Sequence, residues 1–375
     1  MKKFCYFSVF ERCDQYLAKK QARAVRDSGY FVTMVFADGI PDEIEDDLHL
    51  TSIPLKSKIG SYLKRLILYP FFFYKKLKKI DADVYQCCDV DLLLVCLLLK
   101  LRGKRVVFNL LEEHPYTLYS KLRFPNIVNK CIVWFVSLWM KFVLKRIDYV
   151  ITVAPDIIKY LKIWGVRNIT IIGNYPEVNK DYTLTEEEYY RREDCIIYFG
   201  AIYGISCQEE MLDALMTLDN PIKYLLAGDF GVGESYKQML QKHEGWKFVE
   251  FINRFPKEEL KSLIDRSTIS NVLRDFQATF YSSGSYGIIK LFESMEAALP
   301  IICPDVPVYR ELMKEYRCGI LVNPKDPKEI AKAIDFLIKN KKEAYIMGQN
   351  GRKAVIQRYS WDIEKKRYLS IICGV

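Results

Sequence analysis

Short hydrophobic runs alternate with amphipathic segments along the first half of the chain. Residues 15–28 carry apolar side chains at helical spacing, and residues 92–101 are apolar except for Lys100, as helices packed on a sheet are. The runs between such segments have the length and flanking residues of buried strands: 4–9, 31–36, 84–86, 105–109, 149–153 and 169–172. This alternation predicts a doubly wound, largely parallel α/β sheet.

The second half repeats the pattern after an interruption. Residues 177–194 are rich in charge and poor in apolar side chains, which is typical of a linker. Strand-like runs then return at 196–199, 223–226, 247–251, 269–273, 301–303 and 319–322. We therefore predict two α/β domains, residues 1–176 and 195–355, with ligand sites at the carboxyl ends of their strands facing a cleft.

The stretch 284–302 combines a glycine-bearing loop, a helix that Pro300 ends, and a buried strand. The apolar stripe of this helix consists of Leu291, Phe292, Met295, Ala298 and Leu299. Lys290 and Glu293 share the opposite face. A lysine in the first turn opposes the helix dipole, which makes physical sense where a phosphate binds the free backbone N–H groups. An ion pair between Lys290 and Glu293 on a solvated face explains the pattern equally well.

Lys-Leu-Phe-Glu at 290–293, a Met-containing helix and Pro-Ile-Ile at 300–302 resemble the donor-site motif of bacterial, retaining GT-B glycosyltransferases of the family-4 type. The resemblance implies two Rossmann-like domains, the first binding an acceptor and the second a nucleotide-sugar donor. It also implies that residues 356–375 form a helix returning to the first domain. Glu293 would hold the ribose hydroxyls, since a carboxylate accepts hydrogen bonds from both, and Lys290 would lie near the diphosphate.

The same resemblance assigns the remaining donor contacts. They are Gly284, Ser285, Tyr286, Gly287, Gly200 and Leu291, with the glycines allowing close approach of the backbone. Relatives often carry a cation in the loop that corresponds to 200–204, and this chain has none there. Arg254 and Arg274 are candidate substitutes. Many relatives also have a glutamate where this chain has Ser285, so recognition of the sugar is left undefined.

An acceptor site is expected after the strand at 105–109. The relatives' strand-end motif, Tyr-Asp-x-His-Glu, has its counterpart in Asn109, Leu111 and Glu112. Because the motif histidine is replaced by leucine, His114 is the alternative residue that could reach the cleft. A carboxylate or histidine at a strand end is placed to bind an acceptor hydroxyl. The predicted catalytic set is therefore Lys290, Arg254, Glu112 and His114.

Composition narrows the function classes. Eleven cysteines and three histidines show no paired zinc-ligand spacing, so we predict no metal site and a reducing compartment. No Gly-x-Gly-x-x-Gly follows an early strand, which argues against a dinucleotide-dependent oxidoreductase. No cofactor is expected beyond the donor substrate. The sequence also offers no convincing covalent nucleophile, and the resemblance implies a same-face displacement.

The net charge of +9 lies entirely in the first half, which indicates an anionic partner there. Residues 62–80 and 130–146 mix basic with aromatic side chains, as interfacial helices on anionic lipid do. The membrane interpretation is favoured for 62–80, whereas a core helix with a basic flank is equally plausible for 130–146. No reading motif for nucleic acid accompanies this charge. Because no run reaches about 18 apolar residues, we predict an intracellular protein without a membrane-spanning helix.

These observations together predict a retaining glycosyltransferase that moves a sugar from a nucleotide-sugar donor to a lipid-linked glycan acceptor. Its expected role is bacterial surface polysaccharide synthesis at the inner face of the cytoplasmic membrane. Two alternatives stay open: a nucleotide-sugar epimerase with the GT-B fold, and a non-catalytic GT-B scaffold subunit. The reasons for the second are the missing motif histidine, the missing glutamate at Ser285 and the uncharged loop at 200–204.

Overall fold

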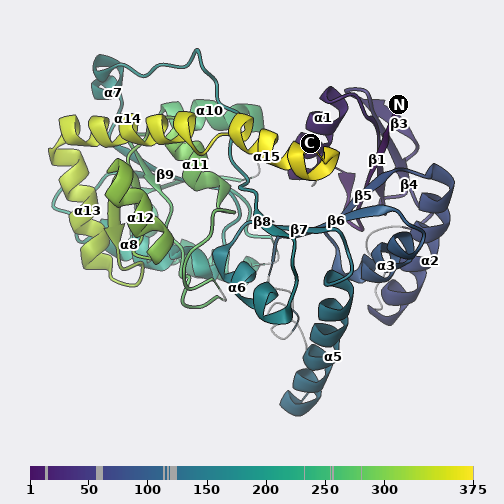
Figure 1. The fold of residues 1–375 in the computed structure, drawn as a ribbon. Coiled ribbons are helices and arrows are strands. Elements are labelled where there is room, and N and C mark those ends of the chain that lie inside the picture. The colour runs from purple at the N-terminus through teal and green to yellow at the C-terminus, as the bar shows by residue number, and fades with distance from the viewer. Residues whose placement is uncertain are drawn as a thin grey trace. The chain divides into compact units, whose positions relative to one another are not determined.

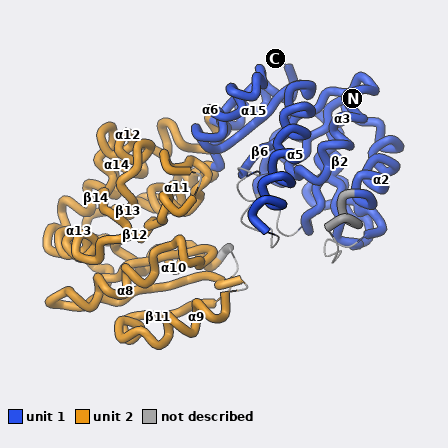
Figure 2. The backbone as a smooth tube through the Cα atoms, turned by 90° about the horizontal axis from the view of Figure 1, so that it is seen from below, with its two compact units in different colours: residues 1–174, 364–375 blue, residues 175–363 orange. Residues whose placement is uncertain are grey.

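The computed structural model describes residues 1–12, 16–55, 62–112, 115, 118, 125–231, 233–253, 255, 257–279 and 281–374. The chain divides into two compact units, shown in Figure 2. Unit 1 comprises residues 1–174 and 364–375, and unit 2 comprises residues 175–363. The corresponding boundaries predicted from the sequence are residues 176 and 355.

Unit 1 is built on an eight-stranded sheet with the order β3-β4-β2-β1-β5-β6-β7-β8 (Figure 1). β3 pairs antiparallel with β4, and the other neighbours pair in parallel. The strands are β1 (Lys3–Phe7), β2 (Phe31–Phe36), β3 (Glu43–Glu45), β4 (Leu48–Ser52), β5 (Val84–Cys87), β6 (Arg105–Leu110), β7 (Tyr149–Thr152) and β8 (Ile169–Ile171). The helices are α1 (Tyr16–Asp27), α2 (Tyr62–Ile80), α3 (Leu93–Leu101), α5 (Asn126–Leu144) and α6 (Pro155–Trp164), with α15 (Trp361–Cys373) entering from unit 2.

Unit 2 contains a six-stranded parallel sheet with the order β11-β10-β9-β12-β13-β14. Its strands are β9 (Cys195–Phe199), β10 (Lys223–Ala227), β11 (Val249–Ile252), β12 (Ile269–Asn271), β13 (Ile301–Pro304) and β14 (Gly319–Val322). Its helices are α7 (Glu186–Arg191), α8 (Gln208–Met216), α9 (Glu234–Gln241), α10 (Lys257–Asp265), α11 (Ile289–Glu296), α12 (Pro307–Tyr316), α13 (Pro327–Lys339) and α14 (Lys341–Gln357). The predicted fold class, two doubly wound α/β sheets, is confirmed.

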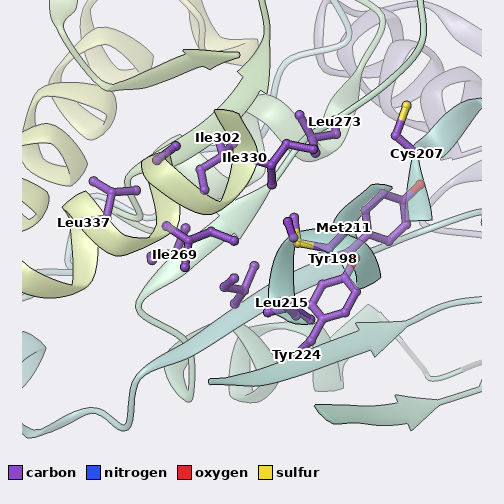
Figure 3. Close-up of a cluster of buried hydrophobic side chains, with 14 of the residues drawn as sticks. Tyr198, Cys207, Met211, Leu215, Tyr224, Ile269, Leu273, Ile302, Ile330 and Leu337 are labelled. Carbon is purple, nitrogen blue, oxygen red and sulfur yellow. The ribbon is translucent and has the colours of Figure 1, made fainter. Parts of the chain in front are cut away.

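The core of unit 2 joins the sheet to helices α8 and α13. Figure 3 shows Tyr198 and Tyr224, from neighbouring strands, beside Met211 and Leu215 of α8. Asn271 of β12 donates a hydrogen bond to the Tyr224 hydroxyl at 2.9 Å. Buried polar groups are rarely left without hydrogen-bond partners, and this bond supplies a partner for both the Asn271 amide and the Tyr224 hydroxyl in the middle of the sheet.

The hairpin of β3 and β4 was not predicted. Its turn residues Asp46 and Asp47 have positive φ values of 49° and 56°, a conformation that Asn-Gly usually signals in a sequence. β3 itself is short, polar and exposed at the edge of the sheet, so it lacks the apolar alternation used to recognise strands.

The segment 177–194, predicted as a linker, lies within unit 2. Leu184 and Tyr189 are its buried residues in the hydrophobic core of that unit, and the Tyr189 hydroxyl donates to the carbonyl of Thr268 at 2.9 Å. Between them, Thr185 and Glu188 form a capping box that starts α7. Two well-placed apolar side chains therefore anchor a segment whose composition is otherwise that of a linker.

Helix α11 ends at Glu296, three residues before Leu299, the last residue of the predicted helix. Ala298 has φ +55°, its N–H donates to the Met295 carbonyl, and the N–H of Leu299 donates to that of Ser294. This is a Schellman cap, in which glycine usually occupies the left-handed position. Ala298 therefore adopts a backbone conformation that favours glycine, and Pro300 follows the cap.

Candidate functional site

The strand order of unit 2 reverses between β9 and β12. From β9 the sheet proceeds to β10 and β11 on one side and to β12, β13 and β14 on the other. Open parallel sheets bind ligands outside the carboxyl ends of the strands at such a switch point. In this unit, Gly200 follows β9, Gly228 follows β10, and the segment that contains Arg274 follows β12.

Gly200 and Gly228 bring two strand ends into backbone contact. The N–H of Gly200 donates to the carbonyl of Ala227 at 2.9 Å, and that of Gly228 donates to Ile252 at 2.8 Å. Gly228 has φ +157°, and a Cβ atom built on it would lie 1.9 Å from the Gly200 carbonyl oxygen. Only glycine fits at position 228, and without side chains at Gly200 and Gly228 a ligand can approach the backbone of both loops.

Lys290 points its amine into this corner. The Nζ atom lies 3.5 Å from the centroid of the Tyr198 ring, and 3.7 Å from where a Cβ of Gly200 would stand. Although the residue is only partly buried, its charged end is desolvated. Desolvation and the nearby Arg274 lower the pKa of Lys290 well below its ordinary value. The alternative of a lysine on a solvated face therefore does not describe its position.

Arg274 supplies the second cation. Its Nε atom is buried and has no hydrogen-bond partner among the described residues, and its guanidinium carbon lies 5.8 Å from the ring centroid of Phe276. Its charge also lowers the pKa of Lys290. Two cations that repel each other at a desolvated corner are stabilised by an anion between them. Of the two substitutes predicted for the missing loop cation, Arg254 lies outside the described residues.

Glu293 lies one turn beyond Lys290 on α11 and is partly buried. Its carboxylate raises the pKa of Lys290, against the effects of burial and of Arg274, so the two side chains are electrostatically coupled. The helix is held against β12 by Ser294, whose hydroxyl lies 2.6 Å from that of Ser270. Its N-cap residue, Ile288, makes no side-chain cap, which leaves the first turn without a competing side chain.

The loop before α11 is fixed by backbone contacts. Gly284 has φ +91°, and a Cβ there would lie 2.9 Å from a methyl group of Val306. Ser285 is buried, its hydroxyl accepts from the N–H of Gly287 at 3.0 Å, and its carbonyl accepts from Tyr309 at 3.3 Å. These bonds hold the loop in one shape next to the helix N-terminus.

Two of the predicted donor contacts, Tyr286 and Leu291, pack their side chains into a hydrophobic cluster of unit 2. The ring of Tyr286 stacks near Phe292 and Tyr359, with centroids 6.4 and 6.3 Å away. Leu291 is fully buried in the same hydrophobic cluster. A ligand at the corner could therefore meet the backbone of Leu291 but not its side chain.

In unit 1 the structure places Glu112 in an exposed bend after β6, and His114 lies outside the described residues. Asp89 was not predicted as a site residue. It follows β5 at the switch point between β1 and β5, and its carboxylate accepts the N–H of Val9 at 3.0 Å. Burial raises its pKa to about 6. The feature of the sequence that could have indicated Asp89 is an acidic residue two positions after a short buried strand.

A hollow of about 630 Å³ lies at the opposite edge of the unit 2 sheet, where β9 and β10 begin. Two of its four basic residues, Arg192 and Arg266, pair with Asp265 and Glu250 at 3.4 and 2.9 Å, and the other two, Arg191 and Lys223, pair with Glu187 and Glu193. Ligand sites of parallel sheets lie at the carboxyl edge, and these charges are already matched. This hollow is therefore not the candidate site.

Two Rossmann-like units make up the GT-B fold of glycosyltransferases, and this chain has that fold. Residues 179–354 match the family model described as "Glycosyl transferases group 1". This match covers most of the second unit and, together with the relatives named as glycosyltransferases, indicates that the protein is a glycosyltransferase.

Two curated relatives come from Methanocaldococcus jannaschii. The uncharacterized glycosyltransferase MJ1069 is 21% identical over 90% of this chain and 88% of its own length. The uncharacterized glycosyltransferase MJ1607 is 28% identical, but the match spans only 33% of this chain and 29% of that relative. Among solved structures, Anabaena Alr3699/HepE in complex with UDP and glucose superimposes with a TM-score of 0.74, at 14% identity and over 100% of both chains. That likeness shows the GT-B fold.

Proposed function

We propose that the protein transfers a sugar from a nucleoside-diphosphate sugar to a glycan acceptor with retention of anomeric configuration. The observation that carries the proposal is the corner formed by Lys290 and Arg274. Two cations, one desolvated and the other with an unpaired buried Nε, lie beside glycine backbone at a switch point. A bound diphosphate would neutralise both cations, accept a hydrogen bond from the Arg274 Nε and lie against the glycine backbone.

Each residue then has a defined task. Lys290 and Arg274 bind the diphosphate and stabilise the charge that develops on it as the glycosidic bond breaks. Glu293 accepts hydrogen bonds from the ribose hydroxyls. Gly200 and Gly284 keep side chains away from the path of the donor. Complexes of Alr3699/HepE with UDP and UDP-glucose support a uridine donor as the first to test.

The acceptor side of the proposal rests on unit 1. We place a lipid-linked glycan there, in surface polysaccharide synthesis at the inner face of the cytoplasmic membrane, because the excess positive charge of the chain lies in that half. Asp89 and Glu112 are two of the described acidic residues that follow strands of this unit, and transfer on the same face of the sugar needs no covalent intermediate.

Calorimetric titration of UDP and GDP tests the donor site. Wild type should bind one of them with a micromolar Kd, and Glu293→Ala should weaken binding at least about tenfold, because hydrogen bonds to a charged group are worth about 1.5–3 kcal/mol. Glu259→Ala is the control, since Glu259 is exposed on α10 of the same unit. Binding that is unchanged in Glu293→Ala would contradict its assignment.

The alternatives have separate outcomes. A scaffold subunit would bind neither nucleotide. An epimerase would convert the nucleotide sugar without any acceptor, whereas a transferase would leave it largely intact until an acceptor is added. With a productive pair in hand, NMR of the anomeric proton in the product decides between retention and inversion.

A further inference from the structure

Helix α5 turns its apolar face outward. Ile127, Trp134, Phe135, Leu138 and Phe142 lie one or two turns apart along one face of the helix, and all are exposed. Trp134 and Phe135 are 57% and 66% exposed. Soluble proteins rarely expose a continuous apolar stripe of this length, and such a stripe marks an interaction surface. In Figure 1 the helix extends away from strands β6, β7 and β8.

The opposite face attaches the helix to unit 1. Its buried residues are Asn129, Met140, Val143 and Leu144, three of which lie in the last two turns. The helix is therefore packed on unit 1 along one face, although its apolar stripe is exposed. One face packs on the protein, while the other, equally apolar, has no described residue covering it.

The charge beside this stripe has a single sign. Lys130, Lys141, Lys145 and Arg146 lie on or just after the helix, and residues 126–147 contain no aspartate or glutamate. The Arg146 guanidinium lies 3.6 Å from the ring centroid of Phe142, at the edge of the exposed stripe. Basic residues bordering an aromatic stripe are complementary to an anionic lipid surface, where the cations reach headgroups and the rings reach the acyl boundary.

Helix α2, the segment favoured from the sequence, has a different arrangement. Tyr69, Phe73 and Leu77 are fully buried at four-residue spacing, so its main apolar face belongs to the core of unit 1. Two large apolar side chains are exposed in its described part, Ile67 at 68% and Phe71 at 61%. Among the described residues, α5 therefore presents the more continuous exposed apolar face of the two stretches.

By length and composition α5 could also cross a membrane, and 22% of its most apolar window is buried. A crossing would separate the two ends of the helix, although β6 and β7 on either side of it are neighbours in one sheet. The chain would have to return through the bilayer in residues 111–125. These contain Glu112, Glu113, Lys121 and Arg123, which are costly in hydrocarbon.

We propose that α5 lies in the plane of an anionic bilayer, with the stripe from Ile127 to Phe142 inserted at the headgroup boundary. This identifies the surface through which the proposed membrane localisation is achieved, and it does not depend on the donor-site chemistry. A second copy of the chain is the competing occupant. The run of cations without acidic residues disfavours it, because two such faces placed together would repel.

Flotation with lipid vesicles tests the proposal on the full chain without nucleotide. Wild type should bind vesicles of phosphatidylcholine with 30% phosphatidylglycerol, and weakly or not at all phosphatidylcholine alone. Trp134→Ser/Phe135→Ser should reduce partitioning more than about tenfold, through lost apolar burial. Lys145→Gln/Arg146→Gln should reduce it about fivefold for each charge, and added salt should mimic that loss.

The matched control is Ile67→Ser/Phe71→Ser, which removes two equally exposed apolar side chains from α2 and should leave partitioning unchanged. Far-UV circular dichroism checks folding of each variant. Nucleotide titration of the α5 variant should match wild type, which separates failure of this surface from failure of the donor site.

Three results would overturn the proposal. Wild type could fail to bind the anionic vesicles. The α2 pair could abolish binding while the α5 pair retains it. Light scattering without lipid could show an oligomer that Trp134→Ser/Phe135→Ser converts to a monomer, which would make the stripe an interface between copies.

Discussion

At the scale of single residues, the buried amine of Lys290 lowers the stability of the folded chain. It is desolvated over an aromatic ring, and its nearest formal charges include another cation. In the unfolded chain the same amine is fully hydrated, so folding is opposed by this group. Violations of local physical rules concentrate at functional sites, and an anion bound beside Lys290 would offset this one.

Lys290→Met is expected to raise stability and remove nucleotide binding. The lowered pKa means that the unfolded chain holds more protons than the folded chain up to the ordinary lysine value of 10.5. Wild-type stability should therefore rise with pH, and the advantage of Lys290→Met at pH 7 should shrink towards pH 10. Urea unfolding at both pH values measures this. The exposed Lys332→Met is the control, and an equal pH slope in wild type and Lys290→Met would contradict the assignment.

Asp89 gives a pH dependence of the opposite sign. Its pKa is about 6 in the folded chain and 3.8 in the unfolded chain, so the folded state binds more protons between these values. Stability should fall by roughly 2 kcal/mol from pH 4 to pH 6.5, and Asp89→Asn should remove that fall. Urea unfolding across this range is the measurement. The exposed Asp47→Asn should behave as wild type, and a fall that persists in Asp89→Asn would assign it to other groups.

At the scale of elements, the last part of α14 holds the site helix in place. Arg352 is buried, and its two terminal nitrogens donate to the carbonyls of Glu296 at 2.6 Å, Asn179 at 2.7 Å and Tyr182 at 2.6 Å. It also pairs with the Glu296 carboxylate at 3.0 Å. One side chain thus joins the start of unit 2 to the end of α11.

Arg352→Met should cost about 3 kcal/mol of unfolding free energy, because it leaves buried carbonyl groups and a carboxylate without their donor. Lys353→Met, at the next and exposed position of α14, should change stability by less than about 0.5 kcal/mol. Chemical unfolding followed by circular dichroism compares the two. Equal small effects would show that the contacts of Arg352 are replaced by water.

At the scale of the whole molecule, the chain belongs to unit 1 at both ends. Helix α15 begins in unit 2, where the N–H of Trp361 donates to the carbonyl of Pro176 at 2.8 Å. It ends in unit 1, where the fully buried Tyr368 donates to Gln86 at 2.6 Å. The last turns of the chain therefore complete the core of the first unit.

Tyr368→Ala should destabilise unit 1 by about 3–5 kcal/mol, the usual cost of removing a buried aromatic side chain. Hydrogen exchange read by mass spectrometry should show faster exchange in peptides from β5 and α1 and unchanged protection in β9 and β10. Lys366→Ala, an exposed neighbour on α15, serves as the control. Faster exchange throughout unit 2 would mean that the two units unfold as one.

The sequence by itself determined the alternation of strands and helices, and two strands, β2 and β14, were predicted with their observed ends. It also singled out Lys290 and Glu293, because a lysine in a first helical turn conflicts with the helix dipole. These features are local: periodicity reports which face of an element is buried, and a charge at a helix end is judged against its own backbone.

Only the tertiary structure decided which residues meet. It brought Lys290 onto Tyr198 beside Arg274, placed Asp89 at a switch point, and packed Leu184 and Tyr189 into unit 2. It also left the apolar stripe of α5 without a cover among the described residues. The physical reason is that a pattern of apolar residues specifies burial without specifying the partner. Strand order and chain crossings select the partner, so the cationic corner and the uncovered helix face exist only in the folded chain.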